Sequence, residues 1–163
     1  MDNVSEANLG GVHPELARRV RRLADKCEAN GIAIRVTQGL RTWGAQDALY
    51  AQGRTAPGKI VTNAPGGHSM HNFGLAVDIV PAAEGFPSFV PDWNAMDLRW
   101  KNVLALAKTC GLAEGAEWRT FPDMPHLYLE ECPANPDDNL RYAFREGGLE
   151  AVWRELKLPE ATT

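Results

Sequence analysis

Cysteine is scarce in this sequence of 163 residues, which contains three. No two of them form a CxxC pair, so neither a disulfide framework nor a cysteine-based zinc site is expected. Cys27 and Cys110 fall on the apolar faces of expected helices and are expected to be buried. Cys132 follows Glu130 and Glu131, which would raise its pKa and disfavour the thiolate, although the pattern alone leaves a nucleophilic role open.

Positive charge is also in short supply, since 17 Lys and Arg residues face 21 Asp and Glu residues and the net charge is −4. That balance argues against a nucleic-acid partner, which would require a basic surface. No apolar run approaches the roughly 18 residues of a membrane span. The opening residues, MDNVSEANLGG, have neither a basic start nor an apolar core, so they do not match a signal peptide. We therefore expect a protein made in the cytoplasm, without membrane insertion.

Hydrophobic residues make up 44% of the chain, enough for one domain with its own core. Apolar periodicity predicts helices over residues 14–30, 42–52, 97–110, 139–146 and 149–156. It predicts strands over residues 32–38, 74–80 and 126–130, with a short one over 59–62. The segment 53–70, which contains that short strand, is rich in Gly and Pro and is expected to be a loop, and 81–95 is expected to be another Pro-rich loop. In the helix expected over 42–52, Ala45, Ala48 and Leu49 are expected to face the core. No linker or repeat divides the chain, so one α+β domain is expected.

The stretch GGHSMHNFGLAVDIV, residues 66–80, places imidazoles and a carboxylate at the start of an apolar run. His71 and Asp78 are seven residues apart, which is not the i+3 or i+4 spacing at which metal ligands recur on one helical face. Their spacing fits a loop residue followed by a strand residue, with Gly74 relieving the backbone between them. A lone acid in an apolar strand is costly unless it is neutralised. Asp78 is therefore either a metal ligand or the partner of an arginine or a backbone amide.

A second candidate group lies in WRTFPDMPHLYLE, residues 118–130. His126 opens an expected strand, and Asp123 precedes it by three residues. Pro122 and Pro125 hold the segment extended and rigid, which presets geometry as a catalytic site requires. The same pattern is also typical of a proline-rich surface loop with a solvated acid and a histidine at a sheet edge.

Two histidines and one carboxylate form a known catalytic zinc set that leaves one position open for water. Zinc lowers the pKa of that water to about 7, and a carboxylate outside the ligand set, here Asp123, can accept its proton. The attacked carbonyl develops negative charge, for which Arg41 in GLRTWGAQ is the candidate cation. Arg41 can equally be a surface arginine paired with an acid. Cobalt, nickel and manganese also accept such ligand sets.

The stretch SMHNFGLAVD fits the pattern S-x-H-x-x-G-x-A-x-D in full, and DMPH follows downstream. Together they resemble the zinc peptidoglycan peptidases, a family that includes D-alanyl-D-alanine dipeptidases and carboxypeptidases and the phage L-alanyl-D-glutamate endopeptidases. GLRTWGAQDALYAQGRT and GKIVTNAPGGHSMHNFG resemble the phage endolysin branch. The resemblance spans about residues 32–130 and implies the hedgehog and D-Ala-D-Ala peptidase type of α+β fold, with helices around a small, mostly antiparallel sheet. We expect one catalytic domain over 1–163 and no separate cell-wall-binding domain.

The resemblance also implies roles for the matching residues. His71, Asp78 and His126 fall on the ligands of one catalytic Zn²⁺ ion. Asp123 falls on the general base, and its being Asp rather than Glu agrees with the endolysin branch. Arg41 falls on the arginine that stabilises the transition state.

Further residues are placed around the cleft by the resemblance or by their type. Ser69 falls on the serine of the motif, which in the family lies at the substrate cleft. Gln46 and Trp118 are expected to shape the cleft, although Trp118 fits the core equally well. His68 occupies a variable motif position and is expected at the rim, and His13 is expected to cap a helix or lie on the surface.

The expected function is therefore zinc-dependent cleavage between L-alanine and D-glutamate in the peptidoglycan stem peptide, by a monomer. The resemblance implies a phage endolysin that waits in the host cytoplasm until a holin opens the membrane, and then lyses the host. Two alternatives remain open: a D-Ala-D-Ala dipeptidase or carboxypeptidase of the same family, and a non-catalytic zinc-binding module of the same fold. A virion-associated lysin would differ from the endolysin only in its delivery.

Overall fold

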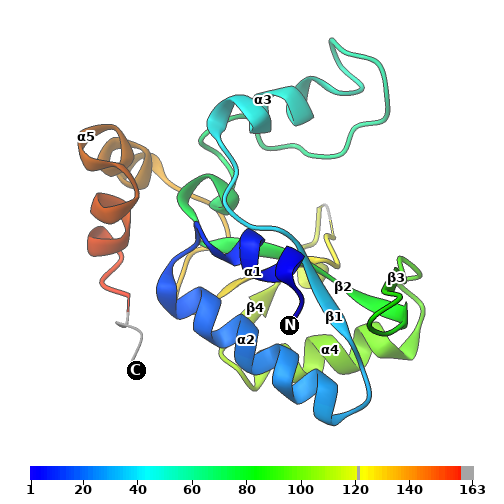
Figure 1. Ribbon diagram of the computed structural model, residues 1–163. Helices are drawn as coiled ribbons and strands as arrows, with labels where there is room; N and C mark the ends of the chain where they lie inside the picture. The colour runs from blue at the N-terminus through cyan, green and yellow to red at the C-terminus, as the bar shows by residue number, and fades with distance from the viewer. Residues whose placement is uncertain (121, 159–163) are drawn as a thin grey trace.

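Strand β2 (Ala76–Glu84) is the centre of an antiparallel sheet with the order β1–β2–β5–β4. The computed structural model describes residues 1–120 and 122–158 (Figure 1). The other strands are β1 (Ile34–Gln38), β3 (Val90–Pro91), β4 (Leu112–Glu114) and β5 (His126–Leu129). Short β3 pairs with the far end of β2, and every pairing is antiparallel. The predicted α+β class with a small antiparallel sheet is confirmed.

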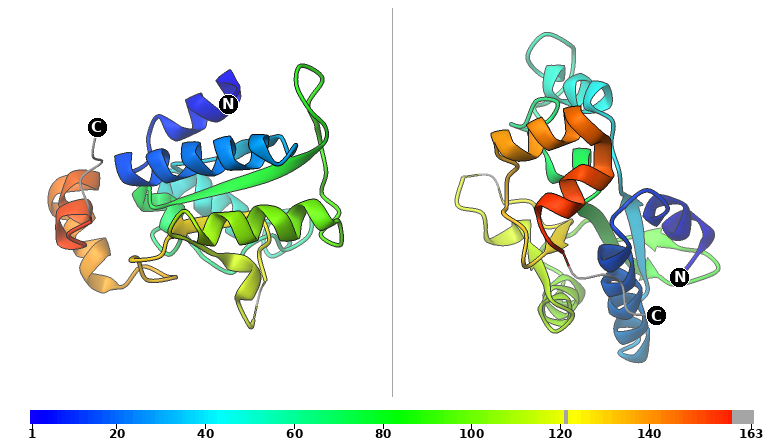
Figure 2. Two further views of the ribbon diagram at one scale, coloured as in Figure 1. Left: turned by 90° about the horizontal axis from the view of Figure 1, so that it is seen from below. Right: turned by 90° about the vertical axis from the view of Figure 1, so that its left-hand side faces the viewer.

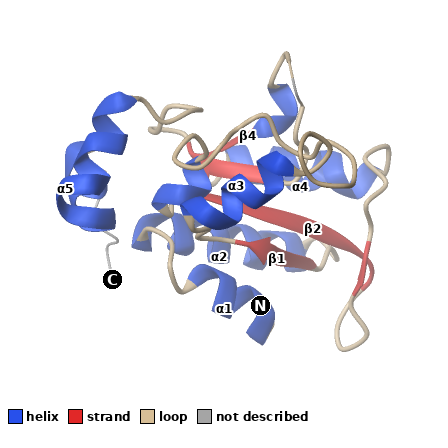
Figure 3. Cartoon of the chain, turned by 90° about the horizontal axis from the view of Figure 1, so that it is seen from above, coloured by secondary structure: helices blue, strands red, loops and turns tan. Residues whose placement is uncertain are grey.

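Helices lie on both sides of this sheet. The helices are α1 (Asn3–Leu9), α2 (Pro14–Ala29), α3 (Trp43–Ala51), α4 (Leu98–Lys108) and α5 (Asp138–Glu155), with short 3₁₀ helices η1 (Met70–Phe73) and η2 (Gly115–Glu117). Helices α2 and α4 pack side by side against one face, while α3 lies on the other side (Figures 1 and 3). Helix α5 and the β2–β3 hairpin lie at opposite ends of the molecule (Figure 2). Among the described residues, no helix has both the length and the apolar character of a membrane span.

Helix α2 shows why the sequence folds this way. Its apolar stripe is fully buried against the sheet, and the His13 imidazole caps its start by accepting a hydrogen bond from the Glu15 amide. On its polar side, Arg19 donates to Glu15 at 2.7 Å, to the Gly111 carbonyl at 2.6 Å and to Glu131 at 2.8 Å. This network ties α2 to the start of β4 and the end of β5.

Most predicted elements are present with small changes at their ends. The helices predicted over 14–30, 42–52 and 97–110 correspond to α2, α3 and α4. The two helices predicted over 139–146 and 149–156 form α5, which is broken where Gly147 and Gly148 leave helical geometry. The strands predicted over 32–38, 74–80 and 126–130 correspond to β1, β2 and β5.

Three predictions about local structure are wrong. The segment 59–62 is not a strand, because its apolar residues Ile60 and Val61 are exposed and pair with no strand in the described part of the chain. Residues 81–95 are not all loop, because β2 continues to Glu84 and pairs with β3. Ala45 and Ala48 are exposed, and Gln46 is the buried residue of α3, since its side chain has hydrogen-bond partners inside. The sequence also gave no indication of α1, β3 or β4.

Candidate metal centre

Three side chains from separate segments meet at one end of the sheet. His71 belongs to η1, Asp78 to β2, and His126 is the first residue of β5. Asp78 and His126 are direct partners in the antiparallel register, which places their side chains on the same face. The chain turns from η1 into β2 at Gly74, whose φ of 65° is left-handed, as the sequence predicted for this bend. The turn brings His71 back over the strand that carries Asp78.

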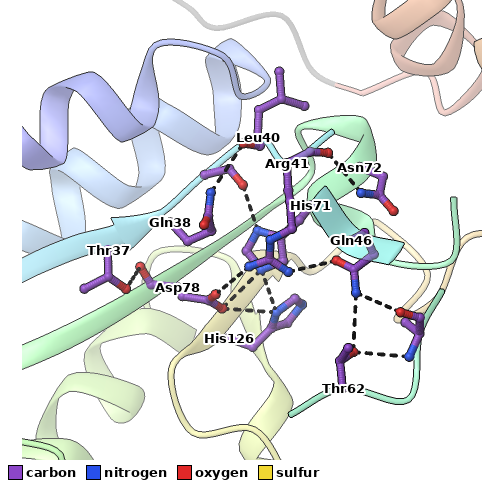
Figure 4. A network of polar contacts seen from close by, with 12 residues as sticks. Thr37, Gln38, Leu40, Arg41, Gln46, Thr62, His71, Asn72, Asp78 and His126 are labelled. Carbon is purple, nitrogen blue, oxygen red and sulfur yellow. Dashed lines mark hydrogen bonds and ion pairs between the residues drawn. The ribbon is translucent and has the colours of Figure 1, made fainter. Parts of the chain in front are cut away.

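The donor atoms of the three side chains form a compact triangle (Figure 4). Nε2 of His71 lies 3.1 Å from Oδ1 of Asp78 and 3.2 Å from Nδ1 of His126. Nδ1 of His126 lies 3.4 Å from the same Asp78 oxygen. Ligand atoms held at about 2.0–2.1 Å around a tetrahedral ion are separated by about 3.3 Å, so the triangle has the size that a zinc ion requires. The residues present therefore fit a metal ion.

A hydrogen bond from its other ring nitrogen sets the orientation of the His71 ring. Nδ1 of His71 lies 2.8 Å from the carbonyl oxygen of Gly39 and donates its proton there, so Nε2 is the nitrogen that faces Asp78 and His126. Nδ1 of His126 faces the triangle. Nε2 of His126 is buried, and the described residues offer it no hydrogen-bond partner. Both imidazoles thus present one nitrogen to a common point.

Charge is concentrated at this point. Burial acts to raise the pKa of Asp78, but the charges and hydrogen bonds of His71 and His126 outweigh it and hold the pKa well below the usual range. The second oxygen of Asp78 lies 3.4 Å from Nη2 of Arg41. Asp78 is therefore an ionised carboxylate with one oxygen facing the imidazoles and the other facing an arginine. Because a half-buried carboxylate of this kind needs positive partners, the arrangement suits a divalent cation.

Asp123 stands beside the triangle without belonging to it. Its amide donates to the Gly115 carbonyl at 3.0 Å, and its carbonyl accepts from the His126 amide at 3.2 Å. Burial, together with the neighbouring charge of Asp78, raises the pKa of the Asp123 carboxyl group. A carboxylate with a raised pKa is a better proton acceptor at neutral pH than a solvated one.

All of these side chains line one cavity of about 1130 Å³. Arg41, Ser69 and Trp118 also line it, as the sequence predicted for cleft residues. Trp118 packs against His126 with ring centroids 4.9 Å apart and also packs against the hydrophobic core, so both expectations for it hold. Gln46 is buried behind Arg41 and is not among the lining residues.

The remaining candidates have structural or peripheral positions. His68 is exposed and lines the cavity, consistent with a place at the rim, and His13 is a buried helix cap. Burial raises the pKa of Cys132 to about 12, and the charge of Glu131 adds to this, so its thiol is protonated. Cys27 and Cys110 are buried, as predicted.

The sequence reasoning missed Asn72, which lies inside the motif and is buried. Its side-chain oxygen accepts a hydrogen bond of 2.9 Å from the Gly67 amide, and its nitrogen donates to the Arg41 carbonyl at 2.9 Å. Asn72 therefore joins the loop before η1 to the segment that carries Arg41. A polar residue next to a candidate ligand in an otherwise apolar stretch was the available signal.

Comparison with known proteins places the chain among peptidoglycan peptidases. The model of the VanY family, described as D-alanyl-D-alanine carboxypeptidase, matches residues 10–113. This range includes Arg41, His71 and Asp78 and ends before Asp123 and His126. The chain is 37% identical over 122 residues to the peptidoglycan L-alanyl-D-glutamate endopeptidase CwlK of Bacillus subtilis (strain 168), covering 72% of this chain and 73% of CwlK.

A second relative comes from a bacteriophage. The L-alanyl-D-glutamate peptidase of Listeria phage A118 is 30% identical over 124 residues, which is 76% of this chain but 40% of the phage protein. Two solved structures share the fold. The Serratia marcescens L-Ala D-Glu endopeptidase ChiX has a TM-score of 0.54 at 23% identity, covering 79% of this chain and 88% of ChiX. The D,D-pentapeptidase VanY from a VanB-type resistance cassette, in complex with Zn(II), has a TM-score of 0.53 at 16% identity, covering 90% and 79% of the two chains.

The family match and the identity to CwlK agree with the side chains gathered at the end of β2. The chain belongs to the VanY family.

Proposed function

We propose that this chain is a zinc-dependent endopeptidase that hydrolyses the bond between L-alanine and D-glutamate in the peptidoglycan stem peptide. The coarser assignment, a peptidoglycan hydrolase, follows from its family and its relatives. The observation that carries the proposal is the triangle of His71 Nε2, Asp78 Oδ1 and His126 Nδ1, with distances of 3.1–3.4 Å, beside a carboxylate and an arginine in one cavity.

The residues of the site divide the chemistry among them. A zinc ion held by His71, Asp78 and His126 would lower the pKa of a water molecule and polarise the scissile carbonyl. Asp123 accepts the proton of the attacking water and returns it to the amine that leaves, a role that its raised pKa favours. The Arg41 guanidinium donates hydrogen bonds to the oxygen on which negative charge develops.

The choice of bond is supported by relatives and by the shape of the cavity. Both CwlK and the phage A118 protein are named for the L-alanyl-D-glutamate bond. The cavity runs from Trp93, near the β2–β3 hairpin, to the segment 134–136 that leads into α5. The metal group lines the same cavity, whose volume of about 1130 Å³ leaves room for a peptide that continues beyond the two residues of the scissile bond. A carboxypeptidase needs room for only one residue on the leaving side.

Delivery is part of the proposal. The protein is a phage endolysin that acts as a monomer, accumulates in the host cytoplasm and reaches the wall once a holin opens the membrane. The relationship to a peptidase of Listeria phage A118 supports this assignment. Detection of the protein in purified virions would instead identify a virion-associated lysin.

Mass spectrometry of digested muropeptides, combined with metal analysis, tests the proposal. The parent protein is expected to bind one zinc ion and to create new N-terminal D-glutamate. Asp123→Ala is expected to bind the same amount of zinc and to lose about 10²–10⁴-fold in rate, the usual contribution of a general base. Release of D-alanine in place of N-terminal D-glutamate would contradict the endopeptidase assignment.

D-alanyl-D-alanine carboxypeptidase is the second candidate, because the matching family model carries that description. The same digestion separates the two activities by their products. A non-catalytic zinc module is the third reading, and Asp123 distinguishes it, since a module without catalysis needs no base. Full wall-lytic activity in Asp123→Ala would show that the assigned base is wrong.

A further inference from the structure

Trp93 is a large apolar side chain in an unusual position. It is 58% exposed and lines the same cavity as His71 and His126. Indole rings are buried on average, and an exposed one beside a polar active site offers a flat apolar surface to a ligand. Neither the metal group nor the proposed acid–base chemistry makes use of it.

The segment that carries Trp93 is held rigidly. The Asp92 amide donates to the Pro81 carbonyl at 2.8 Å, and the Trp100 indole donates to the Asp92 carbonyl at 2.9 Å. The Arg99 guanidinium bridges the Asp92 side chain at 2.6 Å and the Ala82 carbonyl at 2.6 Å. Because the backbone on the N-terminal side of Trp93 is already fixed, packing of a ligand on the indole does not require that backbone to become ordered.

The position of Trp93 along the cavity is set by strand β2. Asp92 is bonded to Pro81, which lies three residues beyond Asp78 on β2, or about 10 Å along the strand. The opposite end of the cavity, at residues 134–136, lies on the side of α5. In Figure 1, β3 lies beside the far end of β2, and α5 lies toward its other end. The backbone that leads into Trp93 therefore lies about 10 Å along the strand from the candidate metal ligand Asp78.

The chemistry of the stem peptide indicates what would occupy this end. The amine of L-alanine is joined to the lactyl group of muramic acid, so the sugar ring begins six bonds from the scissile carbonyl carbon, at most about 7 Å away. A D-alanyl-D-alanine bond lies at the other end of the stem, far from the sugar. An enzyme that cuts after L-alanine must therefore accommodate a sugar close to its metal. The C–H face of a pyranose ring is apolar and packs well on an aromatic ring.

We propose that Trp93 is the platform on which the N-acetylmuramic acid sugar packs when the L-alanyl–D-glutamate bond is in the site, an assignment that rests on the proposed function. Trp93 makes the enzyme select stem peptides that are still attached to the glycan strand. It is a binding and specificity residue and takes no part in bond cleavage.

Paired substrates test the assignment: N-acetylmuramyl-L-Ala-γ-D-Glu-L-Lys and the same peptide with an acetyl group in place of the sugar. We expect Trp93→Ala to lower kcat/KM about tenfold on the muramyl peptide, equivalent to about 1.4 kcal/mol, mainly through KM. On the acetyl peptide the change is expected to stay within about twofold. Trp93→Phe keeps an aromatic face and is expected to retain most of the activity.

Met96→Ala is the matched control. Met96 is 81% exposed on the same connection between β3 and α4 but does not line the cavity, so neither substrate is expected to respond. An equal loss on both substrates in Trp93→Ala, or no loss on either, would overturn the assignment of a sugar platform. If the unmodified enzyme cuts neither peptide at the L-Ala–D-Glu bond, the proposed function itself fails and the platform falls with it.

Discussion

The side-chain oxygen of Gln46 accepts a hydrogen bond of 2.9 Å from Nη1 of Arg41. Gln46 is fully buried, and its nitrogen donates at 2.8 Å to the carbonyl of Ala64. The guanidinium therefore has two fixed partners, Gln46 on one side and Asp78 on the other. Gln46, expected from the sequence to shape the cleft, instead holds Arg41 in place from behind.

Replacement of Gln46 is expected to reduce the rate through Arg41. Gln46→Met keeps the volume but removes the acceptor, and we expect kcat to fall about tenfold with a smaller change in KM, because a misplaced cation stabilises the transition state less well. Gln46→Glu restores an acceptor for Arg41 and should recover part of the loss. Steady-state kinetics on muropeptides measures both effects. A change in KM alone would instead show that Gln46 acts on substrate binding.

Removal of the metal is expected to lower the thermal stability. An ion that binds only the folded state at about 1,000 times its Kd adds about 4 kcal/mol, which for a chain of this size raises Tm by about 10 °C. A chelator should reverse this shift in the parent protein, and His71→Ala should show no shift. His68→Ala is the matched control, since His68 lines the same cavity outside the triangle, and it should respond as the parent does. Calorimetric scans with and without zinc provide the measurement.

Low pH is expected to weaken the network at Glu15. The hydrogen bond with Arg18 is the largest cause that lowers the pKa of Glu15, to about 2 from 4.5, and Arg19 adds to it. Because the folded-state pKa is the lower one, the stabilisation is complete above about pH 4.5 and is lost as the pH falls toward 2. Glu15 is 2% exposed, so the loss is on the order of 3 kcal/mol.

Urea unfolding between pH 6 and pH 2 measures this loss. Glu15→Gln should be less stable than the parent at pH 6, and the difference should shrink as the pH falls. Glu6→Gln is the control, because Glu6 pairs with Arg21 on the surface, where such a pair contributes about 0–1 kcal/mol. A constant difference between Glu15→Gln and the parent across this pH range would contradict the prediction.

The sequence predicted the long periodic elements well, because their burial pattern is local. Helices α2 and α4 can be predicted from their apolar stripes and from their N-terminal caps. The cap of α2 is His13, followed by Pro14, and the cap of α4 is Asp97. Strands β3 and β4 have two and three residues, too few to show a period, and they exist only through their pairing with β2 and β5. Pairing of this kind is a tertiary effect that no short window of sequence contains.

The candidate metal ligands could be predicted from the sequence, but the contacts that orient them could not. The order of motifs pointed to His71, Asp78 and His126, and the structure brings their donor atoms together. The contacts that orient them come from the backbone or from unremarkable residues. The carbonyl of Gly39 fixes His71, and Asn72 anchors the loop that leads to it. A main-chain carbonyl carries no signature in the sequence, so such contacts appear only once the fold is known.

Gly115 provides a further test of how tightly the site is held. A Cβ atom at this position would lie 2.8 Å from the Asp123 carbonyl oxygen and 3.0 Å from Cβ of His126. The backbone cannot yield without moving both residues, so Gly115→Ala is expected to displace the base and one ligand together. A displacement of about 1 Å costs about 10²-fold in rate. Overpacking should also lower stability by about 1–3 kcal/mol.

Gly44→Ala is the control for this substitution, because a Cβ atom at Gly44 in α3 meets no other atom within 4 Å. It should leave the activity unchanged and stabilise α3 by about 0.5–1 kcal/mol. Lytic rate, zinc content and Tm measured on both variants decide the matter. Parental activity and zinc content in Gly115→Ala would mean that the loop carrying Asp123 adjusts freely, and that the close packing of η2 against it does not position the base.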